Sequence, residues 1–218
     1  GSSFVDYAGK DEIQVLNNLA KGTDDQTIVV RFKTSSDGLI FGAGASTNAT
    51  GNNMTLAIKG GQLRVALRNK KKDTNAPNAG LKGFFGSNLN DGNWHTVAIS
   101  FVPSAEYTAE NVRLVIDGGK DLYPAAWVSS WKAGFNQGDG TDFSIFQVGG
   151  GSYVGANSND YATAAFNGTI SSLTVINKAY TVSQLQDITS KTSIGKTTVR
   201  EDARAAYKNK TGFDLDLS

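Results

Sequence analysis

Hydrophobic residues occupy every second position along several segments of the chain. In the stretch QTIVVRFKT, Ile28, Val30 and Phe32 fall on one side of an extended segment, because successive side chains of a strand point to opposite faces. Segments rich in Gly, Asn and Ser separate such stretches, as is typical of turns. The spacing predicts an all-β fold of two packed antiparallel sheets. Further strands are predicted over residues 39–41, 54–59, 62–68, 96–101, 112–116, 143–148 and 166–176.

Glycine-containing turns lie between the predicted strands. Gly60-Gly61 separates two of them and predicts a two-residue hairpin. Asp37, Asp91 and Asp117 are each followed by Gly, which adopts positive φ without steric cost. We therefore expect these aspartates to have turn roles.

The chain changes character after the last predicted strand. Thr181, with Gln184 three positions later, forms a capping-box pattern that predicts a short helix. Residues 197–208 contain good helix formers. The sequence thus predicts one β-sandwich module over residues 4–190 and a C-terminal helical extension or linker over residues 191–218.

Composition narrows the classes of function. The net charge is +1 and no apolar run reaches membrane-spanning length, so neither nucleic-acid binding nor membrane insertion is expected. The chain has no cysteine, which excludes a cysteine nucleophile and is common both among secreted bacterial surface proteins and among cytosolic proteins.

His95 is the single histidine of the chain. It follows Trp94 at the start of a predicted strand, where a packing role is expected rather than a catalytic one. Trp94 and Phe101 are expected in the core. A glycoside hydrolase needs two opposed carboxyl groups, whereas the strand interiors here contain almost no acidic residues. The sequence therefore predicts a module that is not itself an enzyme.

Two polar loops carry oxygen atoms suited to calcium, which takes about six to eight oxygen ligands. They flank the strand predicted over residues 143–148. Ordinary solvated loops are the alternative, and no cofactor is expected to be required. The candidate metal ligands are Asp139, Asp142, Asn157 and Asp160.

Aromatic residues on predicted loops are a second source of ligand contacts. Trp127, Trp131, Tyr153 and Tyr161 lie on or beside such loops. Aromatic faces can pack against the C–H faces of sugars while polar neighbours bind the hydroxyls. Trp127 and Trp131 equally suit a packing role inside the segment that contains them.

The order of motifs in the middle of the chain resembles the laminin-G-like and concanavalin-A-like jelly rolls. Residues 90–95, NDGNWH, lead into an alternating strand, and residues 112–118, VRLVIDG, form a second strand that ends in a turn. The resemblance implies a module that binds glycans or proteins rather than one that performs chemistry.

Over residues 4–190 the chain also resembles the family-40 carbohydrate-binding modules, the lectin-like domains of bacterial sialidases. The segments that carry this resemblance are QTIVVRFKT, LIFGAG, the hairpin around Gly60-Gly61, LVIDG, the strand that runs into Val148-Gly149, and the ending FNGTISSLTVINKAY at residues 166–180. The resemblance implies a sialic-acid site.

In that family an arginine follows the hairpin, with a glutamate two residues before it. Arg68 matches the arginine, and Ala66 stands at the glutamate position. Tyr153 stands near the position of the family's second arginine, and Asn53 replaces an aromatic residue on the first hairpin strand. Strand alternation places Arg64 on the face of Arg68. The expected ligand-binding residues are Arg68, Arg64, Asn53, Tyr153 and Tyr161.

The sequence therefore predicts a non-catalytic glycan-binding module, monomeric within a larger secreted or cell-wall-attached bacterial protein. It would bring a sialidase-like glycosidase or an adhesin to host glycans, sialylated ones included. One alternative is a laminin-G-like protein-interaction or adhesion module. A second is a glycoside hydrolase on the same fold.

Overall fold

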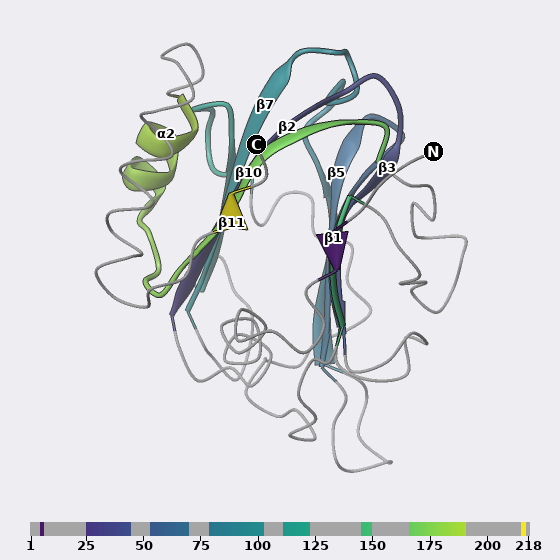
Figure 1. Ribbon diagram of the computed structural model, residues 1–218. Helices are drawn as coiled ribbons and strands as arrows, with labels where there is room; N and C mark the ends of the chain where they lie inside the picture. The colour runs from purple at the N-terminus through teal and green to yellow at the C-terminus, as the bar shows by residue number, and fades with distance from the viewer. Residues whose placement is uncertain are drawn as a thin grey trace.

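A computed structural model describes residues 5–6, 25–44, 53–69, 79–102, 111–122, 145–149, 166–190 and 215–216. In this part of the chain, two antiparallel sheets face each other, and one helix lies on the outer side of one of them (Figure 1). The expected all-β sandwich of the jelly-roll type is confirmed.

Each sheet combines strands that are far apart in the sequence. The six-stranded sheet has the order β1 (Val5–Asp6), β9 (Ile145–Val148), β3 (Gly38–Gly44), β4 (Asn53–Lys59), β5 (Gln62–Asn69), β6 (Ala79–Phe85). The five-stranded sheet has the order β11 (Leu215–Asp216), β10 (Gly168–Ile176), β2 (Gln26–Thr34), β7 (Trp94–Phe101), β8 (Val112–Ile116).

The core lies between the sheets and is built by the inward positions of the alternating strands. Phe32 is fully buried and meets Phe166 edge to face, with 6.0 Å between ring centroids, a favoured arrangement for aromatic pairs. Leu63 and Val65 of β5 and Val97 of β7 belong to the same apolar cluster. The period-2 pattern of the sequence thus identifies the core face of these strands.

The hairpin between β4 and β5 turns at the residues that the sequence predicts. Gly60 and Gly61 have φ of 59° and 71°, as the favoured two-residue hairpin turn requires. The carboxylate of Asp37 accepts hydrogen bonds from both glycine N–H groups, at 2.6 and 3.3 Å. Asp37 thus stabilises the β4–β5 turn, whereas Gly38, which follows it, begins β3.

Helix α2 (Val182–Ser190) begins at the predicted capping box. The Gln184 N–H donates to Thr181 Oγ1 at 3.3 Å, and the Thr181 N–H donates to Gln184 Oε1 at 3.0 Å. Leu185 and Ile188 pack the helix onto the outer face of the five-stranded sheet. On the sheet side the buried partners are Val29, Ala98, Val115 and Ile176.

Two features differ from the predicted elements or lie partly beyond them. β6 begins at Ala79, within a segment for which the sequence predicts no strand. Residues 215–216 form β11 and pair with β10, whereas residues 191–214 of the expected helical extension lie outside the described residues. No helix among the described residues is long and apolar enough to cross a membrane.

Candidate functional site

The outer face of the six-stranded sheet carries three of the five predicted ligand-binding positions. In the β4–β5 ladder, Asn53 is paired directly with Arg68, and Ala57 is paired with Arg64. Leu63 and Val65 point into the core, so strand alternation assigns positions 64, 66 and 68 to the outer face. The backbone thus brings Asn53 and Arg68 side by side.

Arg64 is buried rather than open to solvent. Its relative exposure is 1%, and Nη1 donates a hydrogen bond to Thr55 Oγ1 at 3.3 Å. Thr55 lies on the neighbouring strand and is also buried. The sequence predicts a ligand contact at Arg64, whereas the structure gives it a buried polar partner, because desolvated polar groups need hydrogen bonds.

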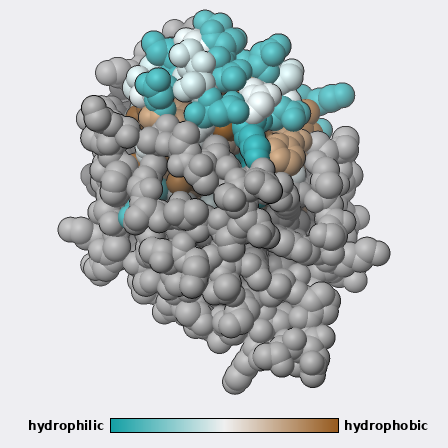
Figure 2. All heavy atoms as spheres, turned by 90° about the vertical axis from the view of Figure 1, so that its right-hand side faces the viewer, coloured by the Kyte–Doolittle hydropathy of each residue, from teal (hydrophilic) through white to brown (hydrophobic). Residues whose placement is uncertain are grey.

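Further polar residues lie on this face. Gln147 of β9 is 4% exposed and is paired with Gly42, which is paired in turn with Thr55. Thr55, Arg64 and Gln147 thus make this face polar where it is described. Figure 2 views the molecule from the same side, and the described side chains visible in it lie at one end of the molecule and are mostly hydrophilic.

Several predicted residues lie outside the described part of the chain. They are the ligand-binding candidates Tyr153 and Tyr161, the metal-ligand candidates Asp139, Asp142, Asn157 and Asp160, and the loop aromatics Trp127 and Trp131. Among the described residues, no group of three or more His, Cys, Asp or Glu side chains is arranged to hold a metal ion.

Trp94 does not lie in the core between the sheets. It is partly exposed, with the Arg31 guanidinium 4.9 Å and the Lys33 ammonium 5.3 Å from its ring centroid. Both cations lie within the range of a cation–π interaction. The expectation for Trp94 was wrong because it is out of phase with Val97 on β7, while the expectation for Phe101 is confirmed.

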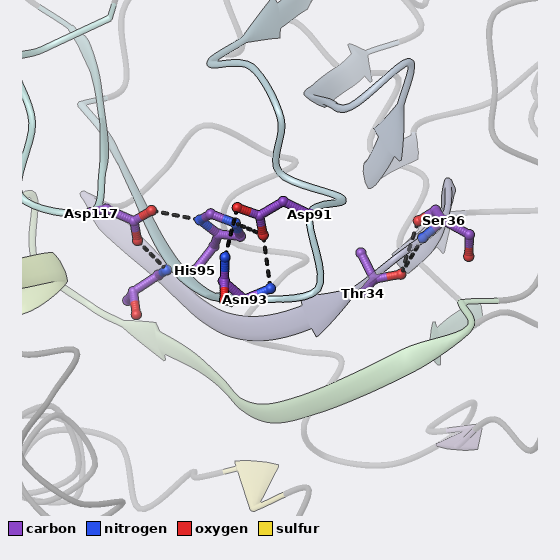
Figure 3. Close-up of polar contacts among 7 residues, drawn as sticks. Thr34, Ser36, Asp91, Asn93, His95 and Asp117 are labelled. Atoms are coloured by element: carbon purple, nitrogen blue, oxygen red, sulfur yellow. Dashed lines mark hydrogen bonds and ion pairs between the residues drawn. The ribbon is translucent and has the colours of Figure 1, made fainter.

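His95 lies between two carboxylates at one end of β7 (Figure 3). Its Nδ1 is 2.6 Å from Asp117 Oδ2, and its Nε2 is 3.1 Å from Asp91 Oδ1. The other oxygen of Asp117 accepts the Thr96 N–H at 2.7 Å. The ring also packs on Phe32, with centroids 5.9 Å apart. His95 thus packs on Phe32, as predicted, and also interacts with two carboxylates.

The electrostatics of this cluster follow from its hydrogen bonds. Burial of the ring lowers the pKa of His95, but the hydrogen bonds to Asp117 and Asp91 outweigh it and raise the pKa above 6.5. Hydrogen bonds from the Asn93 side chain and backbone, followed by that of His95, lower the pKa of Asp91 from 3.8 to about 2.

This arrangement does not resemble a general-base site. A catalytic histidine needs one ring nitrogen free to take a proton from a nucleophile, and both nitrogens of His95 face carboxylates. The sequence contains two signals for the cluster: Asp91 lies four positions before His95, and the Asp117 turn ends the strand paired with β7.

Comparison with known proteins places the chain in a family. The model of the laminin G domain matches residues 32–178. The chain belongs to the laminin G domain family. Neurexin 1 of Drosophila melanogaster is 32% identical over 115 residues, which make up 51% of this chain and 6% of that protein. The chain therefore spans only a small part of the length of this relative.

Solved structures with low sequence identity share the fold. The Ruminococcus gnavus IT-sialidase CBM40 has a TM-score of 0.56 and 16% identity, and the match covers 87% of this chain and 94% of that one. The same module bound to alpha2,6 sialyllactose has a TM-score of 0.50, 17% identity and coverages of 78% and 86%. For the botulinum neurotoxin serotype C1 binding domain, the TM-score is 0.51, the identity 12% and the coverages 88% and 41%.

Family membership supports the general function predicted from the sequence. Laminin G domains are typically non-catalytic binding modules and are generally extracellular. The chain is thus a binding or adhesion module of the laminin G type.

Proposed function

We propose that this laminin G module binds glycans through the outer face of its six-stranded sheet, around the Asn53–Arg68 pair. The observation that carries the proposal is the register of the β4–β5 ladder, which puts an amide-bearing and a guanidinium-bearing residue directly opposite each other. An amide suits sugar hydroxyls, and a guanidinium suits a carboxylate. The ligand class is therefore an acidic glycan, with sialylated glycans as its first members to test.

The neighbouring polar groups support this location. Arg64 and Thr55 form a buried hydrogen-bonded pair on the same face of the sheet. Arg64 lies four positions before Arg68 on β5 and on the same face by alternation, and its positive charge favours an anionic ligand at this face. The hydrogen bond to Thr55 keeps Arg64 in place, so its role in binding is to support the face.

Binding to a glycan array before and after single substitutions tests the proposal. Arg68→Ala should weaken binding of an acidic glycan about tenfold or more, since a hydrogen bond to a charged group contributes ~1.5–3 kcal/mol. Arg68→Lys should keep part of the affinity, because it keeps the charge and loses the bidentate geometry.

Arg113→Ala is the matched control. Arg113 lies on β8 of the other sheet, with its Nε 3.6 Å from Asp121 Oδ2. This variant should bind as tightly as the parent protein. Equal affinity of Arg68→Ala and Arg113→Ala for an acidic glycan would contradict the proposed site.

The biological role that we propose is targeting. The module would belong to a larger secreted or cell-wall-attached bacterial protein, such as a sialidase-like glycosidase. A tethered module raises the effective concentration of its neighbour on a glycan surface. Removing the module from that protein should slow hydrolysis of surface-bound glycans and leave hydrolysis of small soluble substrates unchanged.

A second candidate function is protein-mediated adhesion. The stretch of 115 residues that is 32% identical to Neurexin 1 favours it. This alternative would be favoured if the module bound none of the glycans on the array and bound a purified protein ligand saturably. Catalysis on the same fold would require hydrolysis of a glycan that the array identifies.

A further inference from the structure

The His95 ring connects two turns that belong to different parts of the chain. Asp91 lies in the turn before β7, and Asp117 lies in the turn after β8. Figure 3 shows the ring between the two carboxylates, one on each ring nitrogen. The side-chain exposure of His95 is 12%, against 38% and 34% for Asp91 and Asp117. A single imidazole thus joins both turns at one end of the five-stranded sheet.

The geometry selects one protonation state of the ring. An ionised carboxylate only accepts hydrogen bonds, and a neutral imidazole has one N–H donor and one acceptor nitrogen. Two carboxylates can therefore be satisfied together only by the doubly protonated ring. A neutral ring would turn a lone pair toward one carboxylate, at a distance of 2.6 or 3.1 Å.

The other elements packed near the ring contribute no described charge to it. Phe32 of β2 presents an aromatic ring. Arg31 and Lys33, on either side of it, contact Trp94, whose side chain lies on the opposite face of the sheet from His95. Asp91 and Asp117 are therefore the described ionised groups that face the imidazole.

The Asp117 turn in turn contacts helix α2. The Gly118 N–H donates to Thr189 Oγ1 at 3.0 Å, and the Gly119 carbonyl accepts a hydrogen bond from Gln186 Nε2 at 3.0 Å. A Cβ at Gly118 would lie 2.7 Å from Ser190 Cβ, so the turn packs closely on the end of the helix.

The conformation of Asp117 makes its two hydrogen bonds important for the turn. Its φ is 49°, a left-handed conformation that non-glycine residues rarely adopt. Such a conformation persists where its surroundings hold it. Here the Thr96 N–H and the His95 ring hold the two oxygens of the carboxylate.

We propose that His95 is a protonation-controlled clamp that holds the Asp91 and Asp117 turns together and, through Gly118, fastens the end of α2 to the sandwich. The clamp is closed while the imidazole carries both protons. It opens when the ring loses one of them.

The direction of the pH effect follows from proton linkage. The folded pKa of His95 is raised above 6.5, so the clamp's contribution to stability is complete below the unfolded pKa and is lost as the pH rises through the folded pKa. For each unit by which the folded pKa is raised, the equilibrium constant for opening the clamp increases about tenfold between the fully protonated and the fully deprotonated ring. Mildly acidic conditions therefore close the clamp, and alkaline conditions open it.

An NMR titration of the whole chain tests the protonation state directly. Because His95 is the single histidine, the imidazole ¹⁵N signals are unambiguous. We expect both ring nitrogens to be protonated at pH 6 and the ring to titrate above its ordinary range. A ring that is neutral at pH 6, or that titrates at or below its ordinary pKa, would overturn the proposal.

Two substitutions and a matched control identify the partners. Asp91→Asn and Asp117→Asn each remove one carboxylate, so each should lower the pKa of His95 measured in the titration. Asp37→Asn changes a turn aspartate that bonds Gly60 and Gly61 and does not contact the ring. It should leave the His95 titration unchanged. An unchanged titration in both cluster variants would contradict the clamp.

Hydrogen exchange tests whether deprotonation opens the turn. Protection factors, corrected for intrinsic exchange at each pH, should fall for the Thr96 and Gly118 amides as His95 deprotonates. The Leu89 amide, which donates to the Gly61 carbonyl at 2.9 Å, serves as the internal control. Constant protection at Thr96 and Gly118 across the titration would mean that the ring merely packs there.

Discussion

The outer faces of the two sheets differ in the chemistry of their side chains. On the five-stranded sheet, Val29 and Ala98 are apolar and buried beneath α2, so the chain satisfies this face by its own packing. On the six-stranded sheet, the outward positions include Thr55 and Arg64, which bond to each other, and Gln147. The apolar outer face is therefore covered by a helix of the same chain, whereas the described outward side chains of the other sheet include buried polar ones.

A second difference concerns the cationic residues of the two sheets. Arg31 and Lys33, on the five-stranded sheet, contact the Trp94 ring of their own chain. Arg68, on the six-stranded sheet, is paired through its backbone with Asn53. The first pair therefore has a structural partner in its own chain, whereas the second is the site for which we propose glycan binding.

Removing the helix contact should have the largest effect on stability. Leu185 is fully buried between α2 and the five-stranded sheet. Leu185→Ala should lower the free energy of unfolding by about 2–5 kcal/mol, because it removes apolar contacts and leaves a cavity. Chemical denaturation measures this change.

The control for that variant is Val182→Ala. Val182 is only partly buried in the same cluster. Its substitution should therefore lower the free energy of unfolding by less than Leu185→Ala does. Both variants should keep the affinity of the parent protein for an acidic glycan. Loss of glycan binding in the folded Leu185→Ala protein would move the binding site toward the helix side and break the comparison.

Much of the fold could be predicted because its signals are local. Alternation identified β2 and β8 with the bounds that the structure has, and Gly60-Gly61 identified the hairpin turn. The capping box of Thr181 and Gln184 identified the start of α2. Each signal depends on residues within a few positions of one another, so no tertiary information was needed.

The position of the helix was predictable in part. In β2 the run Ile28-Val29-Val30 is apolar on both faces, which is typical of a strand covered on two sides. Which element covers the second face depends on a contact between β2 and a helix that begins at Val182. Such long-range contacts are not encoded in any local pattern.

The charged clusters were harder to predict for the same reason. The His95 cluster joins Asp91, four positions away, to Asp117, which lies in another turn. The burial of Arg64 depends on its cross-strand surroundings, and not on its own strand alone. Alternation alone, however, would have placed Trp94 on the outer face, since it is out of phase with Val97.

Removing the aromatic ring from the five-stranded sheet should have a moderate effect. Trp94→Ala removes the contacts to Arg31 and Lys33, each of which contributes about 0.5–1 kcal/mol at a partly exposed site. The free energy of unfolding should fall by about 1–2 kcal/mol, including some apolar area. Thermal and chemical denaturation measure the change.

Trp94→Phe is the matched control, because it retains an aromatic face and should lose less stability. Neither variant should change the affinity for an acidic glycan. Weaker glycan binding by folded Trp94→Ala, with Trp94→Phe near the parent value, would show that the five-stranded sheet also takes part in recognition. The assignment of binding to one sheet would then be wrong.

Calcium should have the smallest effect on stability. It tests residues next to the six-stranded sheet. The candidate ligands flank β9, a strand of that sheet. An ion that binds the folded chain with a Kd of ~1 mM stabilises it by about 1 kcal/mol at ~5 mM calcium. The melting midpoint should therefore rise in calcium relative to excess chelator. The double variant with Asp139→Asn and Asp142→Asn should abolish this rise. Magnesium should not replace calcium, because magnesium demands a tighter octahedral site.

Equal melting midpoints with calcium and with chelator would contradict this prediction. They would mean that these residues form ordinary solvated loops and that the glycan site works without a metal ion.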